Sequence, residues 1–296
     1  MDLVDLQLEL THWQNRPNLM VAEQLLARAE ALDFLAFVDE AIRMQRPATP
    51  AGNTLRTAAS TFAGELTACN QALFQQVRNA IRTGTLRGNQ LRSCLTQFTS
   101  YGSPVCDGVY TSYDGLDVLL DGIFRLQQAP APTLPQEVEM VHCEETPARA
   151  ILDLIDHVDW QAHDLFYDLG SGLGQVVMLV NLLTGMAARG VEVEPAFVDF
   201  ATAQATSLQL NAVTFLNCDA RTADYRDGTI FFLFTPFRGD MLRTVLARLQ
   251  EVAADHPIRI CTFGPCTPRV AEQGWLRPCH GNPQHEYQLV IFCSKS

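Results

Sequence analysis

The chain has 296 residues, of which 47% are hydrophobic and 18% charged, and this composition is typical of a folded protein with a sizeable core. No apolar run reaches the roughly 18 residues that a membrane helix needs, and the first residues lack the layout of a signal peptide. We therefore expect a cytoplasmic protein without a membrane partner. The net charge of −12, with no basic patch or tail, argues against nucleic acid as a partner, because a phosphate backbone is bound by clustered cations. The acidity permits a neutral or cationic substrate, or serves solubility alone.

The nine cysteines form no CxxC pair, and most lie in apolar surroundings, which is typical of reduced thiols in a protein core. One group of potential metal ligands lies near the C-terminus: Cys261, Cys266, Cys279, His280 and His285. The spacing of this group matches no standard pair of zinc ligands, and Cys261 falls in an expected strand. We therefore predict no metal site, with a zinc site in this group as the alternative.

The first 130 residues are predicted to be helical, because apolar residues recur at helical spacing. The expected helices cover residues 1–46, about 54–82, 89–98 and 113–126. Residues 128–136 follow, with three prolines and no charged side chain, and we place the domain boundary there. The sequence thus predicts an all-helical domain, residues 1–130, and a second domain, residues 137–296. The helical domain is expected to be a substrate lid, or a bundle for oligomerisation such as a homodimer.

The second domain is organised around a glycine-rich turn between a short apolar strand and a buried helix. The strand, residues 165–167, leads into Asp168, and the helix begins at Gln175. Three glycines stand at alternate positions between them: Gly170, Gly172 and Gly174. A second strand ends at Glu192. Glycines let the backbone approach a ligand closely, so this strand, turn and helix are typical of a nucleotide site in an open α/β sheet.

Two details of the turn indicate which nucleotide is bound. The glycine spacing is GxGxG, and not the GxGxxG of dinucleotide sites, which disfavours a nicotinamide enzyme. Asp168 would repel a pyrophosphate but suits a ligand with an ammonium group, and Glu192 is well placed to bind ribose hydroxyls. S-adenosylmethionine carries both of these groups. The stretch resembles the first two motifs of class I S-adenosylmethionine-dependent methyltransferases.

Four further strands are expected, over residues 212–216, 229–234, 258–263 and 286–292. Asp219, with Ala220 beside it, follows the first of them and is positioned to accept the adenine amino group, with a plain turn role as the alternative. A terminal hairpin is the usual closure of a methyltransferase sheet. The resemblance therefore implies an α/β fold, a Rossmann-like seven-stranded methyltransferase sheet with an N-terminal all-helical domain.

A narrower resemblance covers roughly residues 140–225. The pair Glu145-Thr146, a helix, the run DLGSGLGQVV and the strand end GVE are similar to the non-SET histone-lysine methyltransferases of the disruptor-of-telomeric-silencing type. The residues expected to bind S-adenosylmethionine are Glu145, Thr146, Asp168, Gly170, Ser171, Gly172, Gly174, Gln175, Glu192, Asp219 and Ala220. Thr146 is also expected to be an N-cap, with Pro147 at the first helical position. A capped surface helix is the alternative for this segment.

The resemblance ends at the residues that would handle the methyl acceptor. The family has an Asn-rich loop after its fourth strand, whereas this chain has Thr235-Pro236-Phe237, and it lacks the basic segment that holds nucleosomes. Histone methylation is therefore not supported by the sequence.

Methyl transfer from a sulfonium is an in-line displacement, for which a protein mainly supplies orientation and a dry pocket. The candidate residues on the acceptor side are Thr235, Phe237 and the 264–266 loop as lining, Tyr110 or Tyr113 as a cover, and His142 as a base. A packing role is the alternative for each. We predict an S-adenosylmethionine-dependent methyltransferase that acts on a nitrogen or oxygen nucleophile of an unidentified small-molecule or protein substrate. A catalytically inactive S-adenosylmethionine-binding scaffold is the alternative.

Overall fold

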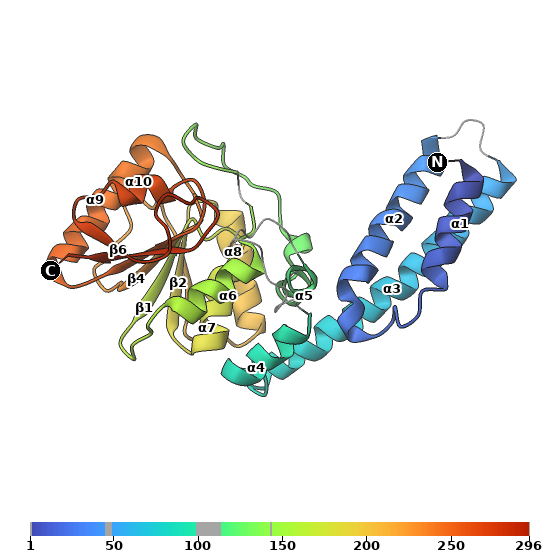
Figure 1. Ribbon diagram of the computed structural model, residues 1–296, viewed down its shortest axis with the longest axis horizontal. Helices are drawn as coiled ribbons and strands as arrows, with labels where there is room; N and C mark the ends of the chain where they lie inside the picture. Colours follow the sequence, from blue (N-terminus) through green and yellow to red (C-terminus); the bar gives the residue numbers. More distant parts are fainter. Residues whose placement is uncertain (1, 45–48, 99–113, 143, 296) are drawn as a thin grey trace.

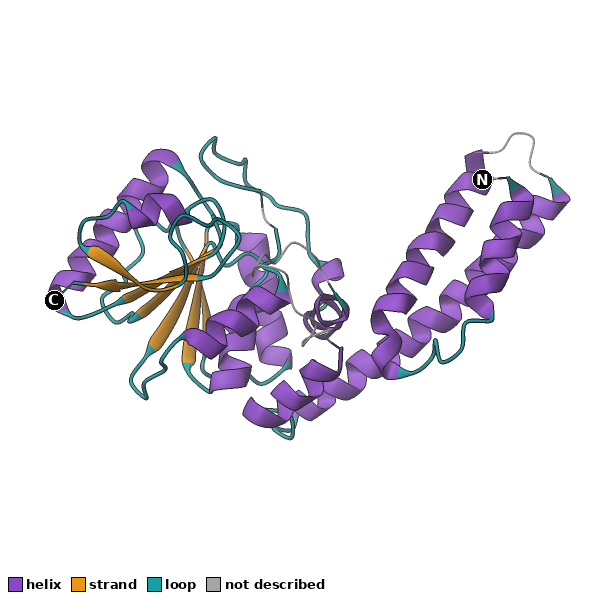
Figure 2. Cartoon of the chain, viewed as in Figure 1, coloured by secondary structure: helices purple, strands orange, loops and turns teal. Residues whose placement is uncertain are grey.

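Seven strands form one sheet in a computed structural model that describes residues 2–44, 49–98, 114–142 and 144–295 (Figure 2). The strands run in the order β3-β2-β1-β4-β5-β7-β6, and all neighbours from β3 to β5 are parallel, whereas β7 is antiparallel to both β5 and β6. This confirms the predicted fold class and the closing hairpin. The strands are β1 (Leu165–Leu169), β2 (Ala187–Glu192), β3 (Val213–Asn217), β4 (Ile230–Leu233), β5 (Arg259–Thr262), β6 (Leu276–His280) and β7 (Val290–Ser294).

The closing hairpin differs from the prediction in its bounds. β6 forms where no strand was expected, and the last strand covers Val290–Ser294 in place of residues 286–292. β6 lies at the edge of the sheet, contains Pro278 and exposes three of its five residues, so it lacks the apolar alternation that signals a strand.

Alternate side chains of the central strands face two different helical layers. In β4, Ile230 and Phe232 belong to one hydrophobic cluster with helices α6 and α7, whereas Phe231 and Leu233 belong to a second cluster with α9. A strand that is covered on both faces reads as a continuous apolar run, as β4 does. The helices of this half are α6 (Ala148–His157), α7 (Gln175–Thr184), α8 (Pro195–Ser207), α9 (Gly239–Asp255) and α10 (Thr267–Ala271).

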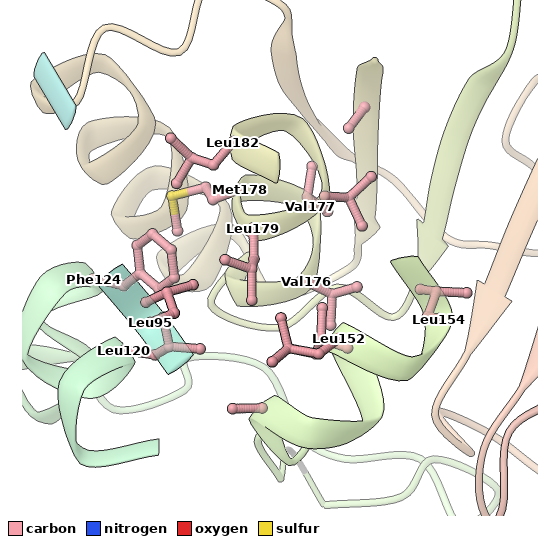
Figure 3. Close-up of a cluster of buried hydrophobic side chains, with 14 of the residues drawn as sticks. Leu95, Leu120, Phe124, Leu152, Leu154, Val176, Val177, Met178, Leu179 and Leu182 are labelled. Atoms are coloured by element: carbon pink, nitrogen blue, oxygen red, sulfur yellow. The ribbon is translucent and has the colours of Figure 1, made fainter. Parts of the chain in front are cut away.

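Three N-terminal helices form a bundle, here called the arm, that projects away from the sheet (Figure 1). Its own hydrophobic cluster extends from Leu6 to Leu66. Val77 and Ile81, near the end of α3, instead join the cluster that α4 and α5 share with α6 and α7 (Figure 3). The helices of this half are α1 (Leu3–Gln14), η1 (Ala22–Gln24), α2 (Leu25–Met44), α3 (Pro50–Arg82), α4 (Gly88–Leu95), η2 (Thr96–Phe98), α5 (Gly115–Phe124) and η4 (Leu126–Gln128).

A buried arginine joins the end of α3 to two other helices. Arg78 is 6% exposed, and its Nη1 donates to the carbonyl oxygen of Ile123 in α5. Its Nη2 donates to Ser207 Oγ at the end of α8, over 2.7 Å. Burial lowers the pKa of Arg78 to about 10, with Arg125 and Arg82 contributing. Helices α5 and α6, on either side of residues 128–136, also share one hydrophobic cluster, and the domain boundary at that segment stays a prediction.

One cysteine pair differs from the prediction of reduced thiols. A disulfide joins Cys279 of β6 to Cys293 of β7, because antiparallel pairing places Cys293 opposite Arg277, two residues from Cys279. The free cysteines are Cys69, Cys94, Cys218, Cys261 and Cys266. Cys106 and Cys143 lie outside the described residues. Within the described residues, no group of three or more His, Cys, Asp or Glu side chains could hold a metal ion, and no helix is sufficiently long and apolar to cross a membrane.

Candidate cofactor and acceptor site

The carboxyl ends of β1 to β4 meet at one edge of the sheet, and the expected cofactor residues lie along this edge. Asp168 in β1 is in register with Gly190 of β2 and Phe232 of β4. Glu192 is the last residue of β2, and Asp219 follows the end of β3 by two residues. Ligands of open α/β sheets bind at such an edge, so the structure brings these predicted residues to one place.

The glycine turn is held in a conformation that other residues rarely adopt. Gly170, Gly172 and Gly174 have φ angles of +81°, +49° and +82°. A Cβ atom on Gly170 would lie 2.3 Å from Cβ of Pro236, and one on Gly174 would lie 2.4 Å from the ring of Phe215. Two of these glycines are therefore required by close packing as well as by backbone conformation.

Glu192 is fixed by two backbone amides. Its Oε2 accepts from Gly172 N and its Oε1 from Glu194 N, each over 2.9 Å. Each carboxylate oxygen has a second lone pair to offer, because an ionised carboxylate accepts at about four positions. The orientation of Glu192 suits the predicted contact with a pair of ribose hydroxyls.

Asp168 is buried without a cation to balance it. Its side chain is 3% exposed, and burial together with the nearby charge of Glu192 raises its pKa to about 8. None of the ion pairs among the described residues involves Asp168. A buried carboxylate of this kind is stabilised by a cationic partner, and the ammonium group of a ligand would supply one.

Two further polar atoms beside the turn are buried and unsatisfied. Ser171 Oγ and Gln175 Oε1 have no hydrogen-bond partner among the described residues, although Ser171 is 8% and Gln175 6% exposed. Buried polar atoms are nearly always hydrogen-bonded, so an orphaned pair at a glycine turn indicates a missing ligand. The residues present therefore fit S-adenosylmethionine in this place.

Asp219 is already occupied by a neighbouring arginine. Its Oδ1 accepts from the backbone and the Nε of Arg221, and its Oδ2 accepts from Nε and Nη2 of the same residue, over 2.5 to 3.0 Å. Hydrogen bonds from Arg221 lower the pKa of Asp219. The carbonyl oxygen of Ala220 accepts from the hydroxyl of Tyr225 over 2.7 Å. An adenine amino group would compete with Arg221 for the Asp219 carboxylate.

The segment before α6 is capped differently from the prediction. Pro147 is the N-cap of α6, and Thr146 makes no capping hydrogen bond. The amide of Ala148 instead donates to Asp117 Oδ1 of α5 over 2.8 Å. The predicted cap by Thr146 is therefore wrong, because a carboxylate from α5 takes that amide. Thr146 is buried all the same, at 6% exposure.

Glu145 lies near other carboxylates. Burial raises its pKa, and the charges of Asp121 and Glu144 raise it further. Asp121 belongs to α5, so this helix as well as the sheet contributes charge next to Glu145. The cofactor contacts expected of Glu145 and Thr146 stay predictions.

The turn after β4 is strained and tied to the next loop. Thr235 has a φ angle of +43°, which is unusual for a β-branched residue. Its Oγ1 accepts from the amide of Cys266 over 3.2 Å, and a Cβ on Gly264 would lie 2.5 Å from the same Oγ1. The structure thus brings Thr235 and the predicted 264–266 loop together.

The other acceptor-side candidates are not assembled around Thr235. Phe237 is 4% exposed and packs in the cluster under α9. His142 is exposed, and no described side chain hydrogen-bonds its ring. Tyr110 and Tyr113 lie outside the described residues. The catalytic assignments of Thr235, Phe237 and His142 stay predictions.

Three residues that secure this edge were not predicted: Pro236 against Gly170, Arg221 on Asp219, and Glu137, which Arg221 also contacts over 2.8 Å. Only the short spacing Asp-x-Arg at Asp219 could have indicated one of these contacts. The others join segments that are distant in the sequence.

A family model described as histone methylation protein DOT1 matches residues 139–226, which is less than a third of the chain. Comparison with curated proteins gives no match. An RNA methyltransferase from Salinibacter ruber in complex with S-adenosyl-L-homocysteine is similar over 51% of this chain and 92% of its own, at 20% identity and a TM-score of 0.38.

A precorrin-6y C5,15-methyltransferase from Geobacter metallireducens is similar over 51% of this chain and 90% of its own, at 15% identity and a TM-score of 0.40. A magnesium protoporphyrin IX methyltransferase from Synechocystis with bound S-adenosylmethionine is similar over 50% of this chain and 79% of its own, at 15% identity and a TM-score of 0.38. The substrates of these proteins differ from one another, and none is transferred to this chain.

The family match confirms the resemblance that the Glu145-Thr146 pair and the glycine turn had indicated. Together with the geometry of the turn, it supports S-adenosylmethionine as the cofactor and methylation as the general chemistry. The C-terminal half of the chain has a class I methyltransferase fold, and its cofactor region is similar to that of the DOT1 methyltransferases.

Proposed function

We propose that this protein is an S-adenosylmethionine-dependent methyltransferase that transfers a methyl group to a nitrogen or oxygen nucleophile of a small-molecule or protein substrate. The observation that carries the proposal is the buried, unbalanced carboxylate of Asp168 at the glycine turn. A structural turn without a ligand would have no reason to bury a carboxyl next to Glu192, where its ionised form lacks a cation.

Each residue at the edge would have a distinct role in holding the cofactor. Asp168 would pair with the ammonium group, and Glu192 would accept from the ribose hydroxyls. Ser171 and Gln175 would gain the partners that they lack, and the glycine turn would let the backbone approach the ligand. The cofactor supplies an already activated methyl group when it is bound.

On the acceptor side, the described residues give more support to a role in orienting the acceptor than to a role in removing its proton. The hydrogen bond from Cys266 N to Thr235 Oγ1 joins two loops after neighbouring strands. Loops joined in this way would help to hold an acceptor in line with the methyl group, and this positioning is the main demand of the reaction. A neutral amine needs no base, whereas a hydroxyl would need one, and His142 is the predicted candidate.

We do not extend the substrate in the family's description to this chain. The turn Thr235-Pro236-Phe237 differs from the Asn-rich loop of the resembling family, and a strongly acidic chain lacks the cations that a nucleosome would demand. The cytoplasmic location, a homodimer and the lack of a nucleic-acid partner stay predictions from the sequence.

The alternative, an inactive scaffold that binds S-adenosylmethionine, has one observation in its favour. His142 is exposed, and no described side chain hydrogen-bonds its ring, so nothing among the described residues orients the predicted base. A turnover measurement separates the two functions.

Two measurements test the proposal in sequence. Calorimetric titration with S-adenosylhomocysteine should give micromolar binding that is lost in Asp168→Ala and Glu192→Ala and retained in Asp199→Ala, which removes an exposed carboxylate of α8. Formation of S-adenosylhomocysteine from S-adenosylmethionine is then measured over panels of amine and hydroxyl acceptors. Failure of the wild-type protein to bind would refute the cofactor, and binding without turnover on any acceptor would favour the scaffold.

A further inference from the structure

Residues 133–141, here called the strap, cross the carboxyl edge of the sheet and are attached at three places. In Figure 1 they belong to the green loop between α5 and α6. The attachments follow the ends of β2, β3 and β4, and β1 with its glycine turn lies between β2 and β4 in the sheet. The strap therefore passes the end of β1, where the cofactor is proposed to bind.

The first attachment is a carboxylate just beyond β2. Glu194 accepts from the amides of Thr133 and Leu134, each over 2.8 Å, and from the hydroxyl of Thr133 over 2.7 Å. Burial acts to raise the pKa of Glu194, but these hydrogen bonds and that from Ala196 lower it to about 2. This end of the strap is held by a group that is ionised at neutral pH.

The third attachment is on the turn after β4. Met140 and Phe237 form an antiparallel bridge, and Val141 N donates to the carbonyl oxygen of Pro236 over 3.1 Å. The carboxylate of Glu139 accepts from two amides in the first turn of α9, over 3.0 and 2.8 Å. This end is held by backbone pairing that does not involve the predicted cofactor residues Asp168, Glu192 or Asp219.

The second attachment, at the middle of the strap, does involve one of them. Arg221 donates through Nη2 to Glu137 Oε1 over 2.8 Å and through the same atom to Asp219 Oδ2 over 2.5 Å. Three N–H groups of Arg221 make four contacts with Asp219, because the single Nε–H is shared between its two oxygens. A carboxylate offers about four acceptor positions, so an adenine amino group would compete with Arg221 for Asp219.

The chain contains a second Asp-x-Arg pair with the same hydrogen bonds but away from the strap. Comparison of the two pairs shows whether an effect comes from the pair itself or from its contact with the strap. Arg226 donates to Asp224 through its backbone amide, its Nε and its Nη2, as Arg221 does to Asp219. Both residues of this second pair are more than half exposed, and within the described part of the chain Arg226 forms no hydrogen bond or ion pair with the strap. Removal of Arg226 is thus a matched control for removal of Arg221.

We propose that Arg221 is a latch that ties the strap to the end of β3, and that the latch and the adenine of the cofactor compete for Asp219. When Arg221 releases Asp219, the carboxylate becomes able to accept from the adenine amino group. The cofactor and the closed latch therefore exclude each other at the Asp219 carboxylate. Arg221 is then a positioning residue whose loss tightens cofactor binding, whereas loss of an ordinary structural contact would weaken it. This inference rests on the proposed function.

The test combines affinity for S-adenosylhomocysteine with amide hydrogen exchange of the strap. In Arg221→Gln, we expect faster exchange over 133–141 and about fivefold tighter binding, which is roughly the strength of one partly exposed ion pair. Glu137→Gln should speed exchange in the same way without tightening binding, because Asp219 stays occupied. Arg226→Gln should change neither quantity, and Asp219→Ala should weaken binding.

The outcomes separate the latch from the cofactor proposal. Unchanged or weaker binding in Arg221→Gln, with its melting temperature retained, overturns the competition. Unchanged strap exchange in both Arg221→Gln and Glu137→Gln overturns the latch. Absence of binding in the wild-type protein overturns the proposed function and the competition, whereas the exchange comparison with Arg226→Gln still decides whether Arg221 holds the strap.

Discussion

The charge of Asp168 predicts how the stability of the cofactor-free protein depends on pH. Folding raises the pKa of this carboxyl from 3.8 to about 8, through burial and the charge of Glu192. Because the folded form is the more easily protonated one, folding takes up a proton between these two values, and stability falls as the pH rises through this range. At pH 7 the linkage corresponds to about 4 kcal/mol of destabilisation relative to acidic pH.

Asp168→Asn removes the titrating group and keeps its shape. We expect the variant to gain on the wild-type protein by about 4 kcal/mol between pH 5 and pH 8, or roughly 6 °C in melting temperature. Melting temperatures of both proteins without cofactor, measured at pH 5, 7 and 8, test this. Asp199→Asn, an exposed site on α8, serves as the control.

A cofactor ammonium group should act in the opposite direction. Saturating S-adenosylhomocysteine is expected to stabilise the wild-type protein far more than Asp168→Asn at pH 8, because the ligand supplies the missing cation. The reasoning is refuted if the two cofactor-free proteins show the same dependence of melting temperature on pH. It is also refuted if both proteins are stabilised equally by the ligand.

Three further changes have expected outcomes. Gly170→Ala should lower the free energy of unfolding, measured by urea unfolding, by about 2 kcal/mol or more, because its φ is +81° and the new methyl group would overlap Pro236. The control Gly274→Ala, which has open space around it, should not lower it. Arg78→Ala should cost about 2 kcal/mol, since it leaves the buried carbonyl oxygen of Ile123 unpaired at the joint between α3 and the sheet-bearing half; equal stability of the variant by urea unfolding would contradict this. Glu194→Gln should lower the melting temperature at pH 7, and the difference from wild type should close as the pH falls from 4.5 towards 2, because the carboxylate contributes above its unfolded pKa and is protonated near its folded value.

The parts of the fold that follow from local chemistry could be predicted from the sequence. The strand before Asp168, the glycines at alternate positions and the helix from Gln175 are contiguous, and each is required by its neighbours. The edge strand β6 was missed because an exposed strand needs no apolar alternation. The Cys279–Cys293 disulfide depends on that strand and was missed with it.

The wrong predictions near the site have a different origin. A backbone amide there had several possible hydrogen-bond partners, and the sequence does not show which of them it takes. Thr146 was a sound candidate for an N-cap, but Asp117, which is 31 residues away along the chain, reaches the amide of Ala148 first. The proline-rich segment 128–136 looked like a linker because it has no charge of its own. Glu194 holds part of it by hydrogen bonds to backbone amides, and any residue type except proline can supply these. Contacts to the backbone leave no trace in the sequence of the segment that is held.

The helix α3 sets a fixed distance in this protein. It runs unbroken for 33 residues, or about 50 Å, and the part from the tip of the arm to the joint at Arg78 is about 42 Å long. A partner held at the tip would meet the cofactor edge only if its own span matched that length. For such a partner the effective concentration at the edge would be high, and for a shorter one it would be close to zero. If the arm held a substrate at its tip, it would select that substrate by length, independently of any pocket.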